Sequence, residues 1–311
     1  MVASFFIRFV AQNFRYMKIT RKKFLQKSLL TALGIGLIPK AFSLSSNKHT
    51  MAETRKLGKT GIEVSPLGMG ASRTQEPAVL RAALDRGITF LDTGRSYAHG
   101  QNEVMIGKTL RGIRHRYVIQ SKMRVQVEEG PASSGQIRRQ MEDSLQESLK
   151  ALQTDYIDVM LLHGVRQEEV IHNDTIRKVF SEMKQRGAIR ACGFSSHINH
   201  VEVLREANKD HFFDVAMVPF NPAGAFEHSQ SDWSTSWNQP ALIEQMQKAH
   251  RNGTGIVAMK TCSGGVHALR KGDQASYSGA VRWVLEHDFV DTTAVAMASF
   301  KEISEHTKER L

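Results

Sequence analysis

The sequence predicts an α/β fold, a (β/α)8 TIM barrel preceded by a short N-terminal β-hairpin. Two observations predict it: short apolar segments alternate with segments of helical period, and the alternation occurs eight times. Eight strand–helix units within about 250 residues are typical of such a barrel. No shift in composition interrupts residues 51–311, so we expect this part of the chain to be one domain.

The hairpin is predicted for residues 55–64, where Gly58 and Gly61 provide bends. The eight strands that follow it are short, rich in Val and Ile, and largely apolar on both faces. A parallel sheet requires such strands because helices cover both of its faces. In order, the predicted strands are residues 64–70, 88–94, 117–123, 156–163, 189–196, 214–221, 255–262 and 292–298.

The segments between these strands have helical periodicity. In one of them, apolar residues recur every three or four positions and form a single stripe, namely Ile137, Met141, Leu145, Leu149 and Leu152. Gly87, Gly187 and Gly253 precede predicted strands and fit the position at which glycine ends a helix. Ser299 is followed three residues later by Glu302, and this spacing predicts a capping box at the start of the last helix.

A Rossmann-type dinucleotide-binding fold is the competing architecture. Gly68 and Gly70 follow the first predicted strand and Asp92 ends the second, as in the glycine-rich fingerprint of that fold. However, Arg73 occupies the place of the third glycine. Eight uninterrupted units also exceed what a doubly wound sheet needs, so the barrel is preferred.

The formal net charge of +11 would suggest a nucleic-acid partner if it were spread over the whole chain. Residues 1–50 contain nine Lys or Arg and no acidic residue. Removing these nine from the 42 basic residues leaves 33 against 31 acidic ones, a net charge of +2 for residues 51–311. The basic excess therefore belongs to the N-terminal segment, and no nucleic-acid partner is expected.

Residues 1–50 are predicted to be an export signal and leader. The basic segment 20–27 precedes the apolar run 28–38, and a cleavage site of small residues lies near Ser43. The stretch TRKKFL resembles the twin-arginine export motif, with Lys22 in place of the second arginine. We expect export to the periplasm through that machinery, or a cytoplasmic location if the leader is not used; Met17 is an alternative start.

Four ionisable side chains are predicted at or just after three successive strand ends. Asp92 ends the second strand, Tyr97 lies on the following loop, and Lys122 and His163 end the third and fourth. Singly, each could be an ordinary turn, rim or core residue. In a barrel, however, the carboxyl ends of the strands gather at one face, where active sites lie. Their joint placement therefore favours a catalytic site.

These residue types suit proton transfer to a carbonyl oxygen. A free tyrosine has a pKa near 10, and a nearby ammonium such as Lys122 is expected to lower it. Asp92 would keep the buried lysine charged, and His163 could orient the carbonyl oxygen through a hydrogen bond. Such a site needs no metal, but it needs a hydride donor.

The stretch FLDTGRSYAHGQNEVMIGKTL, together with Lys122 and His163, resembles the aldo-keto reductase family over about residues 55–305. Glu103 and Gly107 also match the family's loop after the tyrosine. The resemblance implies NAD(P)H-dependent interconversion of aldehydes or ketones and alcohols. Tyr97 would be the general acid, tuned by Lys122 and Asp92, and His163 would position a small-molecule carbonyl or alcohol substrate.

The resemblance also implies cofactor contacts at the ends of the later strands. Ser195 and Ser196 would face the nicotinamide amide, whereas Met217 stands where a glutamine is expected. The expected phosphate-binding positions after the seventh and eighth strands are Lys260, Gly264, Gly265 and Ser299. NADP is expected because it is the family's usual cofactor. NAD remains possible because Ala298 and Ser299 stand where an arginine often clamps the 2′-phosphate.

Substrate selection is expected from two segments, residues 164–174 and the long loop 221–237 with Phe226, Trp233 and Trp237. The sequence leaves two other functions to consider. A metal-assisted hydrolase would use His163, His197, His200 and His99, but no zinc-binding motif is present. A cofactor-loaded barrel that acts as a non-catalytic binding or auxiliary protein is the alternative from a different class.

Overall fold

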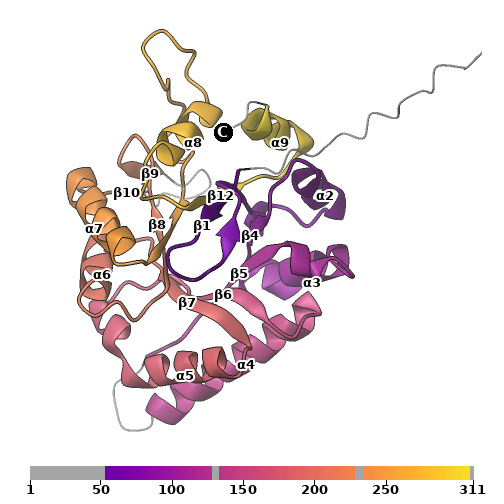
Figure 1. Ribbon diagram of the computed structural model, residues 1–311, viewed down its shortest axis with the longest axis vertical. Coiled ribbons are helices and arrows are strands. Elements are labelled where there is room, and N and C mark those ends of the chain that lie inside the picture. Colours follow the sequence, from indigo (N-terminus) through magenta and orange to yellow (C-terminus); the bar gives the residue numbers. More distant parts are fainter. Residues whose placement is uncertain (1–52, 128–132, 228–233, 309–311) are drawn as a thin grey trace, which may run out of the picture. The chain divides into compact units, whose positions relative to one another are not determined.

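The computed structural model describes residues 53–127, 133–227 and 234–308. Within them, eight parallel strands close into a barrel in the order β11-β12-β3-β4-β5-β6-β7-β8 (Figure 1). The strands are β3 (Leu67–Gly70), β4 (Phe90–Asp92), β5 (Val118–Met123), β6 (Ile157–Leu162), β7 (Ile189–Ser195), β8 (Val215–Pro219), β11 (Gly255–Met259) and β12 (Thr292–Ala296). The predicted barrel is confirmed, and each predicted strand contains an observed one. The predicted leader lies outside the described residues.

One α-helix follows each barrel strand, and these helices surround the barrel (Figure 1). They are α2 (Pro77–Asp85), α3 (Gln101–Thr109), α4 (Ser133–Leu152), α5 (Asp174–Gln185), α6 (His200–Ala207), α7 (Gln239–Arg251), α8 (Tyr277–Leu285) and α9 (Phe300–Thr307). Their apolar faces pack against the outer side of the strands in one large core. None of the helices in the described part of the chain has the length and apolarity that crossing a bilayer requires.

The predicted helix ends are confirmed. Gly87, Gly187 and Gly253 follow α2, α5 and α7 with φ angles of 88°, 74° and 92°, the left-handed region that glycine adopts without steric cost. At the start of α9, the Ser299 side chain accepts a hydrogen bond from the backbone N–H of Glu302. The Glu302 carboxylate in turn accepts one from the backbone N–H of Ala298, at 2.5 Å.

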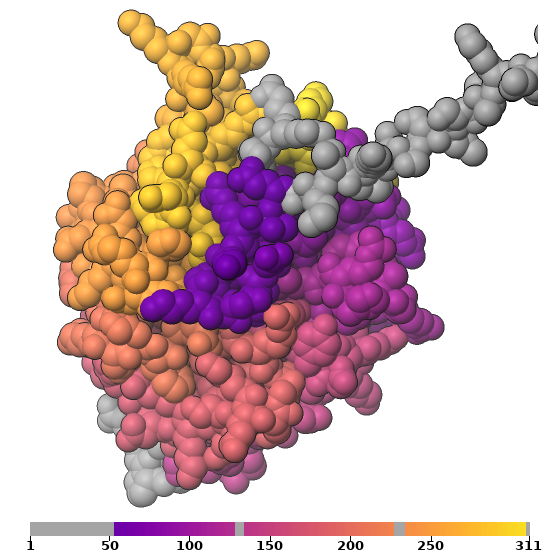
Figure 2. All heavy atoms as spheres, in the orientation of Figure 1, coloured from indigo at the N-terminus to yellow at the C-terminus, as the bar shows by residue number. Residues whose placement is uncertain are grey.

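The predicted hairpin consists of β1 (Arg55–Lys56) and β2 (Glu63–Val64), which pair antiparallel. Leu57, Ile62 and Val64 are buried among the side chains that fill the inside of the barrel. The hairpin contacts the segments that enter β11 and β12: the Lys59 backbone N–H donates to the Gly253 carbonyl, and the Gly58 backbone N–H donates to the Asp291 carboxylate. It therefore covers the amino-terminal end of the barrel, and Figure 2 shows this indigo segment across the centre of that face.

The loop after β8 contains a second hairpin, in which β9 (Ala225–Glu227) pairs antiparallel with β10 (Ser234–Ser236). Phe226 on β9 is buried, and Trp237 packs against the outer core. Trp233 lies outside the described residues. Four short 3-10 helices complete the described chain: η1 (Ala71–Arg73), η2 (Tyr97–Gly100), η3 (Arg114–Arg116) and η4 (Glu168–His172).

Candidate active site

The structure brings Asp92, Tyr97 and Lys122 into direct contact at the carboxyl end of the barrel. The Lys122 ammonium donates hydrogen bonds to Asp92 Oδ1 at 2.5 Å, to the Thr93 carbonyl at 2.7 Å and to Tyr97 Oη at 3.1 Å. Lys122 is 1 % exposed and Asp92 is 3 % exposed. A buried lysine remains charged when a carboxylate pairs with it, so the three groups form one electrostatic unit.

His163 lies beside this unit. Its ring meets the Tyr97 ring edge-on with centroids 5.8 Å apart. Its backbone N–H donates to the Met123 carbonyl at 2.8 Å, which places the end of β6 against the end of β5. Its Nδ1 is 3.3 Å from the Ser96 hydroxyl. If Ser96 donates this bond, the ring proton is on Nε2 and can reach an acceptor in the site.

Burial controls the ionisation of this cluster. Burial lowers the pKa of His163 to about 3, helped by the charges of Lys122 and Arg124, so the imidazole is neutral at neutral pH. Burial also lowers the pKa of Lys122, but Asp92 and Tyr97 more than offset this, and the net pKa of Lys122 is raised. The lysine is therefore charged and the histidine is not.

Burial raises the pKa of the Tyr97 phenol above 10.0, and the opposing effect of Lys122 is smaller. Lys122 lowers the Tyr97 pKa, as predicted, but the net pKa is raised, so the prediction of a lower value overall is wrong. The reason is that loss of water around the phenolate costs more than one nearby ammonium returns. Tyr97 is therefore protonated at neutral pH, as a proton donor requires.

The three residues that follow Tyr97 have an uncommon backbone conformation. Ala98, His99 and Gly100 all have positive φ angles, of 48°, 51° and 83°. Left-handed conformation costs energy at residues other than glycine, so surrounding contacts must maintain this turn. One such contact is the Tyr97 N–H, which donates to the Gly94 carbonyl at 2.9 Å.

A buried carboxylate joins this turn to β5. Glu103, at 0 % exposure, accepts a hydrogen bond from the Ser121 hydroxyl at 2.6 Å and forms an ion pair with Arg95. The Arg95 N–H donates to the Lys122 carbonyl at 3.1 Å. A side chain at Gly100 would overlap the Arg95 guanidinium, so glycine permits this connection. The NEVMIG segment therefore fixes the loop that holds the tyrosine.

Gln120 contacts the cluster and was not predicted from the sequence. Its side-chain amide donates to Asp92 Oδ1 at 2.7 Å, and the same nitrogen lies 3.3 Å from the Met217 sulfur. A signal was available: Gln120 precedes Lys122 by two positions, and residues two apart on a strand face the same side. A polar residue at that position of an apolar strand therefore marks the barrel interior near the lysine.

The two serines predicted to bind the nicotinamide lie at and just after the end of β7, and both are fully buried. Ser195 Oγ accepts from the Gly164 N–H at 3.0 Å, and Ser196 Oγ donates to the Ile198 carbonyl at 2.9 Å. Their hydroxyls therefore stabilise local turns. A nicotinamide amide would bond them only by sharing or replacing these contacts.

The predicted phosphate-binding residues lie after β11 and β12. Lys260 follows β11, and its ammonium lies 3.3 Å from the centre of the Phe226 ring. Burial lowers the pKa of Lys260 to about 7. A Cβ at Gly264 would collide with Asn221 and Ala223, whereas Gly265 has a φ of 94° and no atom within 4 Å of a Cβ position. Gly264 thus packs against the β8 loop, and Gly265 exposes its backbone.

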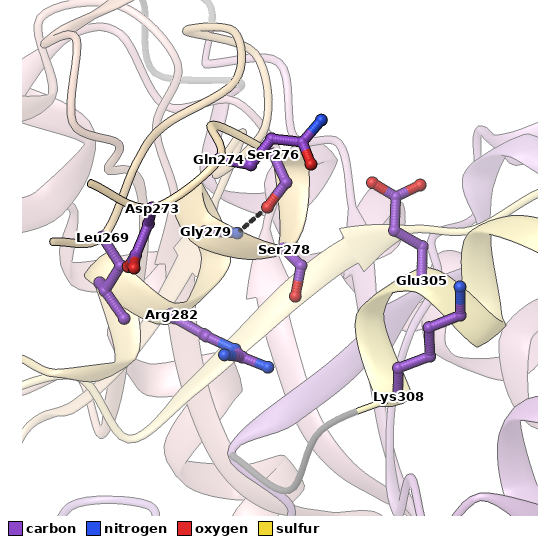
Figure 3. A pocket seen from close by; sticks show the side chains of 9 residues that line it. All are labelled: Leu269, Asp273, Gln274, Ser276, Ser278, Gly279, Arg282, Glu305 and Lys308. Atoms are coloured by element: carbon purple, nitrogen blue, oxygen red, sulfur yellow. Dashed lines mark hydrogen bonds between the residues drawn. The ribbon is translucent and has the colours of Figure 1, made fainter. Parts of the chain in front are cut away.

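A cavity of about 420 Å³ lies between α8, α9 and the segment before α8. Figure 3 shows the Arg282 guanidinium and the Ser278 hydroxyl on the α8 side, Glu305 on α9, and Lys308 directly after α9. Its other lining residues are Leu269, Asp273, Gln274, Ser276 and Gly279. None of these belongs to the cluster around Tyr97 or to the predicted phosphate-binding residues, so this cavity is not the candidate active site.

The histidines weighed as metal ligands do not form a metal centre in the described ranges. The His163 and His197 rings are 6.1 Å apart, and His200 stacks edge-on against Trp237 at 5.2 Å. His99 is exposed on the left-handed turn. Residues 53–127, 133–227 and 234–308 contain no group of three or more His, Cys, Asp or Glu that could hold a metal ion.

A parallel barrel with a tyrosine, a lysine–aspartate pair and a neutral histidine at one rim defines a class, the barrel oxidoreductases. The chain belongs to the aldo/keto reductase family, whose profile matches residues 66–279. The family's members are oxidoreductases, so the prediction that this protein is an oxidoreductase of the aldo-keto reductase family is confirmed.

Two relatives resemble this chain in sequence, and one solved structure resembles it in fold. Uncharacterized oxidoreductase YqkF of Bacillus subtilis (strain 168) is 29% identical over 248 residues, 77% of this chain and 74% of the relative. Aldo-keto reductase YhdN of the same organism is 31% identical over 157 residues, 46% of this chain and 47% of the relative. The holo form of aldo-keto reductase AKR11C1 from Bacillus halodurans has a TM-score of 0.65 at 24% identity. The match covers 83% of this chain and 90% of the AKR11C1 chain, and it supports the fold.

Buried neutral histidines predict acid sensitivity. Burial lowers the pKa of His200 to about 4, and its side chain is 3 % exposed. An unfolded histidine binds a proton near pH 6.5, so between that pH and about 4 the unfolded chain holds more protons than the folded one. The contribution of each such histidine to the free energy of unfolding is therefore fully present above pH 6.5. It falls by about 1.4 kcal/mol per pH unit as the pH drops from 6.5 toward 4.

His200→Gln is expected to reduce the pH dependence of the free energy of unfolding by about 1.4 kcal/mol per pH unit between pH 6.5 and 4.5. The measurement is denaturant unfolding at several pH values from 6.5 to 4.5. His115→Gln, at an exposed position on η3, is the matched control and should leave the slope unchanged. An unchanged slope in His200→Gln would show that this imidazole titrates normally in the folded chain.

Proposed function

We propose that this protein is an NAD(P)(H)-dependent reductase that interconverts an aldehyde or ketone and the corresponding alcohol. The observation that carries the proposal is the 3.1 Å hydrogen bond from the Lys122 ammonium to Tyr97 Oη, with Asp92 on the same ammonium. A phenol whose departing proton leaves a charge beside a fixed cation is suited to general acid catalysis.

Each residue has a distinct role in the proposed reduction. The reduced nicotinamide supplies the hydride when it is bound. Tyr97 donates its proton to the carbonyl oxygen, and Lys122 stabilises the phenolate that remains. Asp92 keeps Lys122 charged, and Gln120 orients Asp92. His163, being neutral, holds the carbonyl oxygen with Nε2–H; in alcohol oxidation the Tyr97 phenolate accepts the hydroxyl proton.

The described residues fit a dinucleotide. Gly265 leaves its backbone open to a phosphate, and α9 begins after β12 with the positive end of its dipole. Lys260 lies at the end of β11, where burial lowers its pKa to about 7, and a bound phosphate would favour its charged form. The Glu302 carboxylate, however, occupies the same helix terminus through Ala298. This carboxylate disfavours a second anion at the same terminus, so the choice of cofactor rests on family membership: we propose NADP and keep NAD as the alternative.

We further propose that residues 1–50 direct export, and this rests on the sequence pattern alone. Twin-arginine export moves folded proteins, so a cofactor could be bound before transport. The two proposals are independent, because the proposed chemistry requires only the barrel.

Fluorescence titration of the purified protein with NADPH and with NADH tests the proposal first. We expect saturable binding of reduced cofactor, with tighter binding of NADPH. A panel of aldehydes and ketones should then cause consumption of the bound or free reduced cofactor. Binding without turnover of any carbonyl would favour the non-catalytic auxiliary protein, and absence of binding would refute both.

A further inference from the structure

Arg124 is the first residue after β5 and lies two positions beyond Lys122. The preceding residue, Met123, accepts the backbone N–H of His163, so the chain leaves the barrel at Arg124 directly beside the candidate substrate-positioning histidine. The Arg124 side chain is exposed. Among the described residues its guanidinium makes no ion pair or hydrogen bond, unlike Arg95 on the neighbouring turn, which pairs with Glu103 and Glu147.

Arg166 occupies the corresponding place after β6. Two bonds hold its turn against β7 and the turn after it: the Val165 N–H donates to the Ser195 carbonyl at 2.8 Å, and the Asn199 side chain donates to the Arg166 carbonyl at 3.2 Å. The Arg166 guanidinium is exposed and, within the described ranges, also lacks a carboxylate partner. Glu168, two residues later, bonds Asn199 instead.

The two arginines flank a pair of neutral imidazoles. The rings of His163 and His197 are 6.1 Å apart at this rim. The positive charge of Arg124 acts to lower the pKa of His163 and, against the effect of burial, that of Tyr97, and the charge of Arg166 acts to lower the pKa of His197. The carboxylate that opposes them at Tyr97 is Asp92, which Lys122 already neutralises. This side of the rim is therefore positively charged.

We propose that the substrate carries an anionic group, a carboxylate or a phosphate, in addition to its carbonyl, and that Arg124 and Arg166 bind this group. The inference rests on the function proposed above and names its substrate class. A guanidinium fork matches the geometry of both anions. The cofactor positions proposed above lie after β7, β11 and β12, so they leave the ends of β5 and β6 for the substrate.

Matched substrates test the proposal in the full-length protein. Pentanal is compared with 5-oxopentanoate for the carboxylate, and glyceraldehyde with its 3-phosphate for the phosphate. We expect a preference in kcat/KM of roughly tenfold or more for at least one charged member, since a hydrogen bond to a charged group contributes that much. The larger ratio identifies the anion, and the preference should shrink at high salt.

Arg124→Gln and Arg166→Gln are expected to reduce this ratio at least fivefold, mainly by raising KM for the charged substrate. Arg81→Gln, an exposed arginine on the outer face of α2, is the matched control and should leave the ratio unchanged. A ratio near one in the wild type, or one that survives in both arginine variants, would overturn the proposal. A loss of cofactor affinity in these variants would also overturn it, because the arginines would then serve the dinucleotide.

If neither member of either pair is reduced, the proposed function is decided by the wider carbonyl panel, and the anion site is decided separately by binding. Calorimetry of the cofactor-loaded protein with 5-oxopentanoate and with glyceraldehyde 3-phosphate gives the readout. The site is supported if the wild type binds one of these compounds and if Arg124→Gln or Arg166→Gln abolishes this binding. Absence of binding, or equal binding by both variants, overturns it.

Discussion

Tyr97→Phe is expected to lower kcat for carbonyl reduction by about 10²–10⁴-fold, the usual contribution of a general acid, and to leave cofactor affinity unchanged. Phenylalanine keeps the ring, which lies 5.8 Å from His163 and 4.8 Å from the Lys122 ammonium. It removes only the hydroxyl that accepts the hydrogen bond from Lys122. Steady-state kinetics and fluorescence titration of the reduced cofactor measure the two quantities.

The matched control is Tyr117→Phe, at the residue that precedes β5 on the opposite end of that strand. It removes the same hydroxyl group away from the rim and should retain wild-type kcat. A Tyr97→Phe enzyme whose kcat stays within about threefold of the wild type would remove Tyr97 from the role of acid. A parallel loss of cofactor affinity would instead indicate that the hydroxyl holds the dinucleotide.

Lys122→Met should abolish measurable turnover and also destabilise the fold by about 3–5 kcal/mol, since removal of one member of a buried ion pair leaves the other charge uncompensated. Lys122 and Asp92 are 1 % and 3 % exposed, and their contact distance is 2.5 Å. Methionine has a similar length and keeps the packing. In the variant, Asp92 still accepts the hydrogen bond from the Gln120 side-chain amide, but it has no cation beside it. Denaturant unfolding measures the free-energy loss.

The double variant Lys122→Met/Asp92→Asn separates stability from catalysis. Asparagine removes the buried charge, so part of the lost free energy should return, while turnover should not. An unfolding free energy for Lys122→Met equal to that of the wild type would mean that the pair contributes nothing to the fold. Recovery of turnover in the double variant would contradict the role of the ammonium.

The barrel and its rim could be predicted from the sequence because both depend on order along the chain. Val- and Ile-rich strands alternate with helices that end at glycines, and parallel strands bring their carboxyl ends to one face. The predicted strands were too long at most ends, for example at 88–94 against Phe90–Asp92. The reason is that apolar residues continue into turns where ladder pairing has already stopped.

Features that depend on tertiary environment could not be predicted. The direction of the Tyr97 pKa is set by how much water the fold removes, and the sequence shows only the neighbouring lysine. Similarly, the spacing of Ser195 and Ser196 does not reveal that their hydroxyls bond to backbone groups. Gln120 could have been identified, because its two-residue spacing from Lys122 places both on the inner face of β5.

Transfer of deuterium from the C4 position of reduced nicotinamide tests the proposed chemistry most directly. The protein is incubated with cofactor that carries deuterium at both C4 positions and with the carbonyl compound that it turns over best, and the alcohol is analysed by mass spectrometry and NMR. With the wild type, we predict one deuterium on the former carbonyl carbon. With Tyr97→Phe, we predict that the amount of labelled alcohol is lower by at least about a hundredfold. Equal labelled product from both proteins, or alcohol without deuterium on that carbon, would contradict the proposed transfer.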